Sequence, residues 1–463
     1  MTTYGTPSVP PSGPMTSAEK IQGIVDAGTC VGCGACVVLA IGGTAKMRAT
    51  QGGPVPSFDA GETFSDIAWT ACPGKGVDYP ELYRQHFGNL PEDWRVGIVN
   101  KMWTGFACDQ VIRRAGASGG VTSRVLIHLL ETGRVDGVVL ARQDLPIPGE
   151  ATWFIARSKE EILQCAGSVY IPVPMLESLS SFRSGERYAM TCVPEQTSAL
   201  RVLQHAGHEQ AQQVEYVLGA YTGTALYPGA IRALLRSKGI PDHDAITSLQ
   251  WRAGEWPGYL EIKTTGGKTV RSKKVYYNFL IPFYVTRASL QSMDFANEFT
   301  DLSVGDAWSP KFESLGAGFS VIASRTEKMT ALLEEMETAG LLELDAVDPL
   351  EASAMHGHMI DFKKRGGYLR NRWRRLIGLA APDYGLRPQP LDAARIIVEV
   401  IISTIFLIAG TPVARKILEW IPEEILGPAF NKLRLFWKAA SKPAKRKGLK
   451  NLSMTCHTPE WKS

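Results

Sequence analysis

The sequence predicts a mixed α+β fold, with helices and short buried strands alternating in its central part. Val121 to Glu131 repeats apolar residues at helical spacing, and Val135 to Leu140 follows as a short apolar strand. Further along, Ser303 to Trp308 has the pattern of a strand that runs into a loop. We therefore expect a small N-terminal segment, a mixed α/β body and a helical C-terminal extension.

Shifts in composition divide the 463 residues into five parts. The first is rich in Thr, Ser, Pro and Gly and is expected to be a disordered lead-in. The second holds a group of closely spaced cysteines, the third and fourth are the two halves of the body, and the fifth is the extension. In order, these parts cover residues 1–14, 15–90, 95–212, 213–385 and 386–463.

The overall composition is that of an ordinary globular protein. Hydrophobic residues make up 44% and charged residues 21%, which excludes a wholly disordered or fibrous chain. Eight cysteines in 463 residues are too few for a disulfide scaffold. The N-terminus lacks the pattern of a secretory signal, so we expect a cytoplasmic protein with reduced thiols. A formal net charge of +4 does not indicate nucleic acid, and no nucleic-acid partner is expected.

The C-terminal extension begins with an apolar run and ends with a basic one. Ile396 to Gly410 holds one charged residue among 15, whereas a membrane span needs about 20 apolar residues. A second amphipathic stretch runs from Ile417 to Trp437. Residues 432–450 hold eight Lys and Arg and no Asp or Glu, so the rest of the chain has a formal net charge of −4.

Three arrangements of the extension are compatible with this pattern. In the first, which the sequence favours, the apolar helix packs against the body and the basic tail is solvated. In the second, the helix and the basic residues, with Phe436 and Trp437, bind in plane to an anionic membrane surface. That surface would be the inner face of the cell membrane. The third, a true span, is disfavoured by the length of the run.

Three cysteines near the N-terminus have the spacing of an iron–sulfur motif. Cys30, Cys33 and Cys36 form Cys-Val-Gly-Cys-Gly-Ala-Cys, and the two glycines let the backbone approach a cluster closely. A bacterial ferredoxin has its fourth cysteine three residues later, followed by proline, but Ala40 occupies that position here. The missing Cys-Pro pair appears at Cys72, which supplies a fourth ligand.

The four thiols predict one 4Fe–4S cluster, with zinc as the competing interpretation. Structural zinc usually takes two separated pairs of ligands, which this spacing does not provide. The remaining cysteines occur singly, and each is best interpreted as a small hydrophobic residue. They are Cys108, Cys165, Cys192 and Cys456.

A run of small residues precedes the predicted helix at Val121. It reads Arg-Arg-Ala-Gly-Ala-Ser-Gly-Gly from Arg113 to Gly120. Backbone N–H groups at such a helix start, with the positive end of the helix dipole and nearby arginines, favour a phosphate. The alternative is a simple turn, because paired glycines before a helix often form one. From the loop itself, Arg113 and Gly116 are candidate phosphate-binding residues.

Taken together, the motifs of this chain resemble the beta-subunit family of coenzyme F420 hydrogenases and dehydrogenases. That family also includes ferredoxin-dependent chlorophyll-pigment reductases. The resemblance extends roughly over residues 25–345, and its specificity comes from the order of the motifs. In chain order they are CVGCGAC, Cys72-Pro73-Gly74, RAGASGGVTS, GSVYIP at 167–172, WRAGEWPG at 251–258, YYNFLIPFY at 276–284 and DLSVGDAW at 301–308.

The resemblance implies an iron–sulfur flavoprotein oxidoreductase. Such a protein passes electrons between a 4Fe–4S cluster, FAD and a third partner, which is a ferredoxin, a deazaflavin or an organic substrate. By position, Ser118, Gly119 and Gly120 would lie at the FAD phosphates. The residues that would line the flavin or substrate cleft are Trp251, Arg252, Glu255, Gly258 and Asp306. From composition alone, the 251–258 piece also fits a turn with a core tryptophan, and Asp306 a loop cap. No catalytic acid is assigned.

The chain departs from the family pattern at three positions. Many relatives carry Cys-x-x-Cys-x-Asp. In this chain Ser289 and Ser292 replace the two cysteines, whereas Asp294 is retained. Glu195 replaces a further cysteine. Serine and glutamate are poor ligands for an iron–sulfur cubane, so we expect a single cluster. The departures also leave an alternative function, a membrane-associated accessory or assembly subunit that keeps the family fold without turnover.

Overall fold

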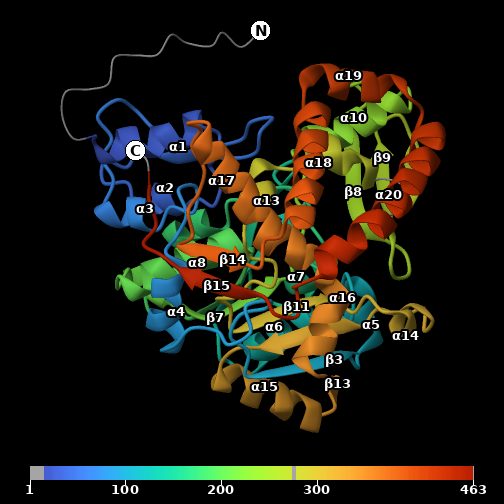
Figure 1. Cartoon of the computed structure of the whole chain (residues 1–463). Helices are drawn as coiled ribbons and strands as arrows, with labels where there is room; N and C mark the ends of the chain where they lie inside the picture. The colour runs from blue at the N-terminus through green and yellow to red at the C-terminus, as the bar shows by residue number, and fades with distance from the viewer. Residues whose placement is uncertain (1–14, 274–277, 462–463) are drawn as a thin grey trace.

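The computed structural model describes residues 15–273 and 278–461. The predicted lead-in at residues 1–14 lies outside the described residues, as do the two tyrosines that open the 276–284 motif. The predicted fold class is confirmed, because the body is a mixed α/β structure built around one large sheet (Figure 1).

The central sheet has eight strands in the order β13-β3-β12-β11-β7-β6-β4-β5. Strands β11, β7, β6 and β4 are parallel neighbours, and the pairs toward both edges are antiparallel. The bounds in chain order are β3 (Lys101–Ala107), β4 (Gly137–Gln143), β5 (Ala151–Ala156), β6 (Tyr188–Cys192), β7 (Val214–Ala220), β11 (Leu302–Asp306), β12 (Ser320–Ser324) and β13 (Leu342–Ala346).

Helices cover both faces of this sheet. One face is buried by α5 (Gln110–Ala115), α6 (Val121–Glu131), α7 (Lys159–Gln164) and α15 (Glu327–Thr338). The other face is buried by η1 (Met175–Ser181), α8 (Pro194–His205) and α9 (Glu209–Gln212), together with the N-terminal cysteine segment. The helix predicted from Val121 to Glu131 has the same bounds in the structure.

The N-terminal segment is a small layer of short elements packed on η1. It consists of α1 (Ser17–Asp26), α2 (Ala35–Val38), the hairpin of β1 (Lys46–Arg48) and β2 (Val55–Ser57), and α3 (Asp66–Thr70). Helix α4 (Tyr79–Phe87) then leads into the body.

A second, antiparallel sheet is inserted between β7 and β11. Its strands are β8 (Ile246–Ala253), β9 (Tyr259–Thr264) and β10 (Thr269–Lys273), and α10 (Gly229–Ser237) packs with it around Trp251 and Leu260. The chain returns to the large sheet through η2 (Asn278–Leu280), α12 (Ile281–Tyr284) and α13 (Arg287–Gln291). Helix α14 (Pro310–Glu313) follows β11.

The C-terminal quarter of the chain, from Pro349 onward, is mainly helical and folds back over the body. Its elements are α16 (Pro349–Asp361), the π-helical turn η3 (Phe362–Gly367), α17 (Tyr368–Leu376), β14 (Leu386–Gln389), α18 (Ala393–Ala409), α19 (Pro412–Trp420), α20 (Glu423–Arg446) and β15 (Ser453–Cys456). Strands β14 and β15 pair, and the last described residue, Trp461, lies beside the cysteine segment (Figure 1). There the ammonium of Lys75 lies 3.4 Å from the centre of the Trp461 ring.

The helices of the extension differ in one respect from the predicted ones. The stretch from Ile417 to Trp437 is broken, because α19 ends at Trp420 and α20 begins at Glu423. Pro422 lies at the break, and proline disfavours helical geometry at the residue before it. In the described residues, no single helix has the length and apolarity of a membrane span, although α18 and α19, bent by 74°, reach these criteria as a pair.

Candidate functional site

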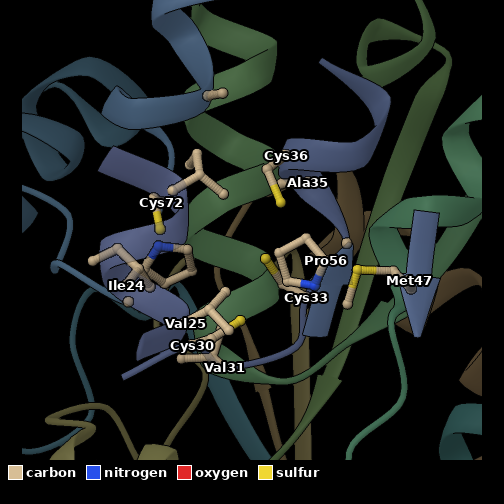
Figure 2. A pocket seen from close by; sticks show the side chains of 15 residues that line it. Ile24, Val25, Cys30, Val31, Cys33, Ala35, Cys36, Met47, Pro56 and Cys72 are labelled. Carbon is tan, nitrogen blue, oxygen red and sulfur yellow. The ribbon is translucent and has the colours of Figure 1, made fainter. Parts of the chain in front are cut away.

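The four predicted ligand cysteines line one pocket, although Cys72 lies 36 residues after Cys36 in the sequence. Cys30 and Cys33 lie on the loop before α2, Cys36 is the second residue of α2, and Cys72 follows the end of α3. Figure 2 shows their sulfur atoms pointing into a common space from different sides. The rest of the lining is mostly apolar and includes Ile21, Ile24, Val25, Val31, Met47 and Pro56.

Two glycines give the ligand loop its tight path. Gly32 and Gly34 have φ values of 69° and 88°, in the left-handed region that favours glycine. A Cβ at Gly34 would lie 2.7 Å from the backbone nitrogen of Glu177, so any side chain there would push η1 away. The loop is joined to η1 by a hydrogen bond in which the Leu176 N–H donates to the Cys33 carbonyl at 2.9 Å.

The surroundings of the four thiols disfavour the negatively charged thiolate form unless a positive charge is bound among them. Burial raises the pKa of Cys30 to about 12, with a smaller raising contribution from Cys72. The pKa values of Cys33 and Cys36 are also raised, first by burial and then by the neighbouring cysteines. A bound metal centre favours the thiolate form, and an apolar pocket with four thiols therefore suits a cationic iron core.

The shape of the site also matters for the kind of metal centre. In the part of the chain that the structure describes, no three His, Cys, Asp or Glu side chains are arranged for a single metal ion. The four cysteines instead surround an open space, as the ligands of a cubane do. The residues present fit a 4Fe–4S cluster, and the choice between iron and zinc stays a prediction for metal analysis.

The glycine loop connects α5 to α6 beside the end of β3. Asp109 caps α5 by accepting a hydrogen bond from the N–H of Val111 at 2.8 Å. Arg113 donates to the carbonyl of Gly318 at 2.9 Å and lies over the ring of Phe106, 3.6 Å from its centre. The Arg113 guanidinium, which is predicted to attract a phosphate, thus also links this loop to the segment just before β12.

Close packing is one clear role of the glycines in this loop. A Cβ at Gly119 would lie 2.6 Å from the carbonyl oxygen of Gly105, and one at Gly116 would lie 2.7 Å from the Cα of Gly120. Gly120 itself has a φ of 73°. The N–H of Gly119 already donates to the hydroxyl of Ser320 at 3.0 Å, so a phosphate would have to be bound by other groups of the loop. Ala117 and Ser118 are half-buried, and the hydroxyls of Ser118 and Ser320 are hydrogen-bonded at 2.8 Å.

Two of the predicted cleft residues meet directly. Arg252 donates through Nη1 to both carboxylate oxygens of Asp306, at 3.1 and 2.9 Å, and both side chains are largely buried. The rings of Trp256 and Trp308, from the same two motifs, lie 4.9 Å apart. Asp306 is also paired across β11 and β12 with Ser320. The 251–258 motif, the GDAW motif and the glycine loop are thereby joined at one end of the large sheet.

The other cleft candidates have different surroundings. Trp251 is buried in the core of the small sheet, and its Nε1 donates to Gln143 at 3.2 Å. Glu255 is exposed, and its carbonyl accepts from the N–H of Gly258 at 2.8 Å in the turn between β8 and β9. Gly258 has a φ of 80°, so a glycine is favoured there. Cofactor contact by Trp251, Glu255 or Gly258 stays a prediction.

A single segment links the cysteine pocket to the Arg252 and Asp306 pair. Tyr170 hydrogen-bonds to Arg252, and burial raises the pKa of the Tyr170 phenol. Four residues later, the carbonyl of Pro174 lies against Gly34 of the ligand loop, 3.2 Å from where a Cβ would stand. Four residues span at most about 14 Å when fully extended. The two regions are therefore connected through one short segment of the chain, residues 170–174.

The positions that depart from the family pattern are occupied by a buried polar network. The hydroxyl of Ser289 accepts from the N–H of Ala225 at 2.8 Å, and that of Ser292 donates to the Asp294 carbonyl at 3.2 Å. Lys363, from the π-helical turn, donates to the Ser289 carbonyl at 2.9 Å. Burial lowers the pKa of Lys363 to about 8, and nearby Glu195 opposes this shift. These side chains are already engaged with protein groups.

Sequence reasoning missed several residues of the site. Ser320 connects the glycine loop to Asp306, but a serine inside a strand carries no motif. His356 of α16 is buried against the Tyr221 ring and lies beside Asp306. Burial lowers its pKa to about 4, which makes it a neutral imidazole near neutral pH. No local signal separates it from an ordinary core histidine.

Comparison with known families identifies the body of the chain. Residues 102–180 match the coenzyme F420 hydrogenase/dehydrogenase beta-subunit N-terminal model, and residues 185–349 match the C-terminal model of the same subunit. Together the two models cover more than half of the chain. The chain belongs to the coenzyme F420 hydrogenase/dehydrogenase beta-subunit family. The two models meet between residues 180 and 185.

Individual relatives agree with this family assignment. The chain is 23% identical over 354 residues to a coenzyme F420-dependent sulfite reductase of Methanocaldococcus jannaschii, covering 72% of this chain and 50% of that protein. It is 25% identical over 250 residues to the coenzyme F420 hydrogenase beta subunit of Methanococcus voltae, covering 53% of this chain and 84% of that subunit. The chain thus spans about half the length of the first relative and most of the second.

A solved structure shows the same fold. It is a chain from the F420-reducing nickel–iron hydrogenase complex of Methanosarcina barkeri, with a TM-score of 0.50 and 18% identity. The match covers 63% of this chain and 98% of that one. Both family models leave out the cysteine segment and the C-terminal extension, so these two regions are interpreted from their own residues.

Proposed function

We propose that this member of the F420 hydrogenase/dehydrogenase beta-subunit family is an iron–sulfur flavoprotein oxidoreductase. One observation carries the proposal: four cysteines from two separate parts of the chain line one buried, mostly apolar pocket. Four thiols gathered around one space are the ligand set of an iron–sulfur cubane, which is a redox centre. The names of the relatives, an F420-dependent reductase and hydrogenase subunits, support a redox role.

Each region of the site has a proposed task. Cys30, Cys33, Cys36 and Cys72 would hold one 4Fe–4S cluster, and the loop from Gly116 to Gly120 would hold the phosphates of FAD. When bound, the cluster supplies one-electron transfer, and the flavin couples one-electron transfer to two-electron transfer. Arg252 and Asp306 would orient the bound flavin or substrate, and their mutual ion pair keeps both side chains in fixed positions.

The proposed partners follow from the same site. A ferredoxin would deliver or accept single electrons, whereas a deazaflavin or another organic substrate would exchange a hydride equivalent. The proposed setting is the cytoplasm, at the inner face of the cell membrane, because thiols stay reduced in the cytoplasm and the basic extension suits that surface.

Anaerobic purification of the full-length chain tests the cofactor assignment. We expect flavin absorption bands with a broad iron–sulfur shoulder, and about four iron and four sulfide per chain. Cys72→Ser should remove most of the iron, whereas Cys108→Ser, at an exposed single cysteine, should leave iron content unchanged. One zinc per chain without iron would overturn the cluster, and a colourless protein would favour the accessory-subunit alternative.

The flavin site needs a separate variant. Gly119→Asp is unsuitable, because its side chain would collide with the backbone of β3. Ala117→Asp places a negative charge at a half-buried position of the loop and should release FAD while iron is retained. Ala117→Ser is the matched neutral control and should keep FAD. Full FAD content in Ala117→Asp would show that the phosphates lie elsewhere.

A further inference from the structure

Helix α18 has both of its charged residues buried and most of its apolar residues exposed. Arg395 and Glu399 are fully buried, whereas Ile397 and Leu407 are 59% and 75% exposed. A helix on the surface of a water-soluble protein has the opposite arrangement. None of the exposed residues in this part of the helix carries a charge: they are Ala393, Ala394, Ile396, Ile397, Val400, Ile401, Thr404, Ile405, Leu407 and Ile408.

Buried ion pairs fix this orientation. Arg395 donates to Asp361 at 2.9 Å and to Glu399 at 2.9 Å, and Arg370 donates to Glu399 at 2.6 Å. Rotating α18 about its axis to bury the apolar face would pull these charges apart and leave them unpaired in the interior. The exposed apolar face is therefore built into the fold, as a consequence of where the partners on α16 and α17 lie.

The next two helices extend the apolar surface. On α19, Val413 and Trp420 are exposed. On α20, exposed apolar residues recur every three or four positions and form one stripe along the helix. That stripe consists of Ile425, Ala429, Leu433, Phe436 and Ala440. Figure 1 shows α18, α19 and α20 as a continuous arch around the small sheet.

Helix α20 also carries exposed basic side chains, which lie mainly off the apolar stripe. Lys432, Lys438 and Lys442 are exposed, and residues 432–450 contain no acidic residue. An apolar stripe with basic residues on the rest of the helix surface is typical of helices that lie in the headgroup region of anionic membranes. We propose that α18, α19 and α20 form one docking surface for an anionic lipid bilayer, with α18 inserted by its outward apolar face.

Helix α18 lies in the plane of the membrane. The 17 residues of α18 measure about 26 Å at 1.5 Å per residue, shorter than the roughly 30 Å hydrocarbon core. The inner face of α18 is held against the body by the ion pairs of Arg395 and Glu399, so only the outer face is available to lipid. The lysines of α20 would lie at the level of the phosphate groups.

Charge distinguishes lipid from a second copy of the chain. A symmetric dimer through this arch would bring the basic stretch 432–450 of each copy toward the other, and like charges would repel. An anionic bilayer has the complementary charge and an apolar interior for the isoleucines. The inference is independent of the proposed cofactors, because the arch lies outside the matched family region.

Vesicle sedimentation with the full-length chain tests the proposal. We expect binding to vesicles that contain phosphatidylglycerol and weak binding to pure phosphatidylcholine. High salt should release part of the bound protein, because salt screens the lysines but leaves apolar insertion intact. The double variant Ile397→Ser/Leu407→Ser should bind phosphatidylglycerol vesicles about tenfold more weakly or worse. Leu315→Ser, at a similarly exposed leucine of the body, is the matched control and should bind as the unaltered chain does.

A second pair of variants addresses charge. Lys438→Glu/Lys442→Glu should weaken binding to phosphatidylglycerol, whereas Lys311→Glu should leave it unchanged. Quenching of tryptophan fluorescence by brominated lipids measures insertion of the otherwise unaltered chain. The fluorescence of the exposed Trp420 should be quenched, and this part of the quenching should be absent in Trp420→Phe. Absence of binding to either vesicle overturns the proposal. So does a concentration-dependent dimer that disappears in the double variant without any vesicle binding.

Discussion

Helices α6 and α18 are both apolar, yet their apolar residues face in opposite directions. In α6, Val125, Leu126 and Ile127 are fully buried in the core of the large sheet. In α18, Ile397 and Leu407 are exposed, and the fully buried residues are Arg395 and Glu399. The apolar side of α6 is covered by the strands of the large sheet, whereas in α18 the charged side is covered, by α16 and α17.

The difference shows that apolar content does not decide which side of a helix is buried. The buried side is set by the groups available in the body. Helix α6 packs against strands with apolar side chains. Helix α18 packs against Asp361 and Arg370, whose buried charges are paired with Arg395 and Glu399 of α18. The apolar side of α18 is then left for whatever lies outside the protein. Variants of the two helices can break or sharpen this comparison.

The largest expected effect comes from placing the same residue in both helices. Leu126→Asp would bury an unpaired carboxylate in the main core and should lower the free energy of unfolding by about 4 kcal/mol or more. Ile397→Asp changes an exposed residue and should alter it by less than about 0.5 kcal/mol in water. Chemical denaturation in the absence of lipid measures both. Equal losses for the two variants would show that Ile397 is buried in solution.

The same two helices show how far the sequence could predict the fold. The bounds of α6 could be predicted because its apolar spacing and the preceding glycines are local signals. For α18, the apolar run was equally plain, but its orientation depends on Asp361 and Arg370, which are distant in the sequence. The sequence therefore left three arrangements open, and the structure combines a packed inner side with an exposed outer one.

A second contrast lies between buried and exposed ion pairs of the extension. Glu399→Gln would leave Arg370 and Arg395 without their shared carboxylate in the interior, and should cost about 3–5 kcal/mol of stability. Glu424→Gln removes an exposed partner of Lys238 and should cost less than about 1 kcal/mol. Thermal unfolding compares the two variants. A small loss for Glu399→Gln would mean that the orientation of α18 is not fixed by its charges.

For the candidate site, local and distant signals separate in the same way. Cys30, Cys33 and Cys36 are recognisable from spacing alone, and Cys72 from the proline that follows it. Ser320 could not be found, because a strand serine is common and acquires meaning only from neighbours far away in sequence. Tyr170 lies in the GSVYIP motif, but its contact with Arg252 could not be predicted from that motif. Arg252 and Asp306 were named through resemblance, and their direct contact became visible in the structure.

The smallest expected effect concerns how the two helices begin. The residue before α6 is Gly120, which has no side chain to cap the helix. The residue before α18 is Asp392, whose carboxylate caps the helix by accepting from the N–H of Arg395 at 2.8 Å. That hydrogen bond lowers the pKa of Asp392. Asp392→Ala should therefore cost about 1 kcal/mol at neutral pH.

The pH dependence of that cost follows from the sign of the shift. A carboxyl whose pKa is lowered by folding stabilises the native state above its unfolded pKa, about 3.9, and the contribution is lost as pH falls through the lower, folded value. The gap in urea midpoint between the unaltered chain and Asp392→Ala should accordingly narrow below about pH 4. Asp392→Asn retains an oxygen acceptor without the charge, and should keep most of the stability with little pH dependence of its own. A gap for Asp392→Ala that stays constant down to pH 3 would show that the carboxylate does not cap α18. Its start would then resemble that of α6, held by packing rather than by its first residue.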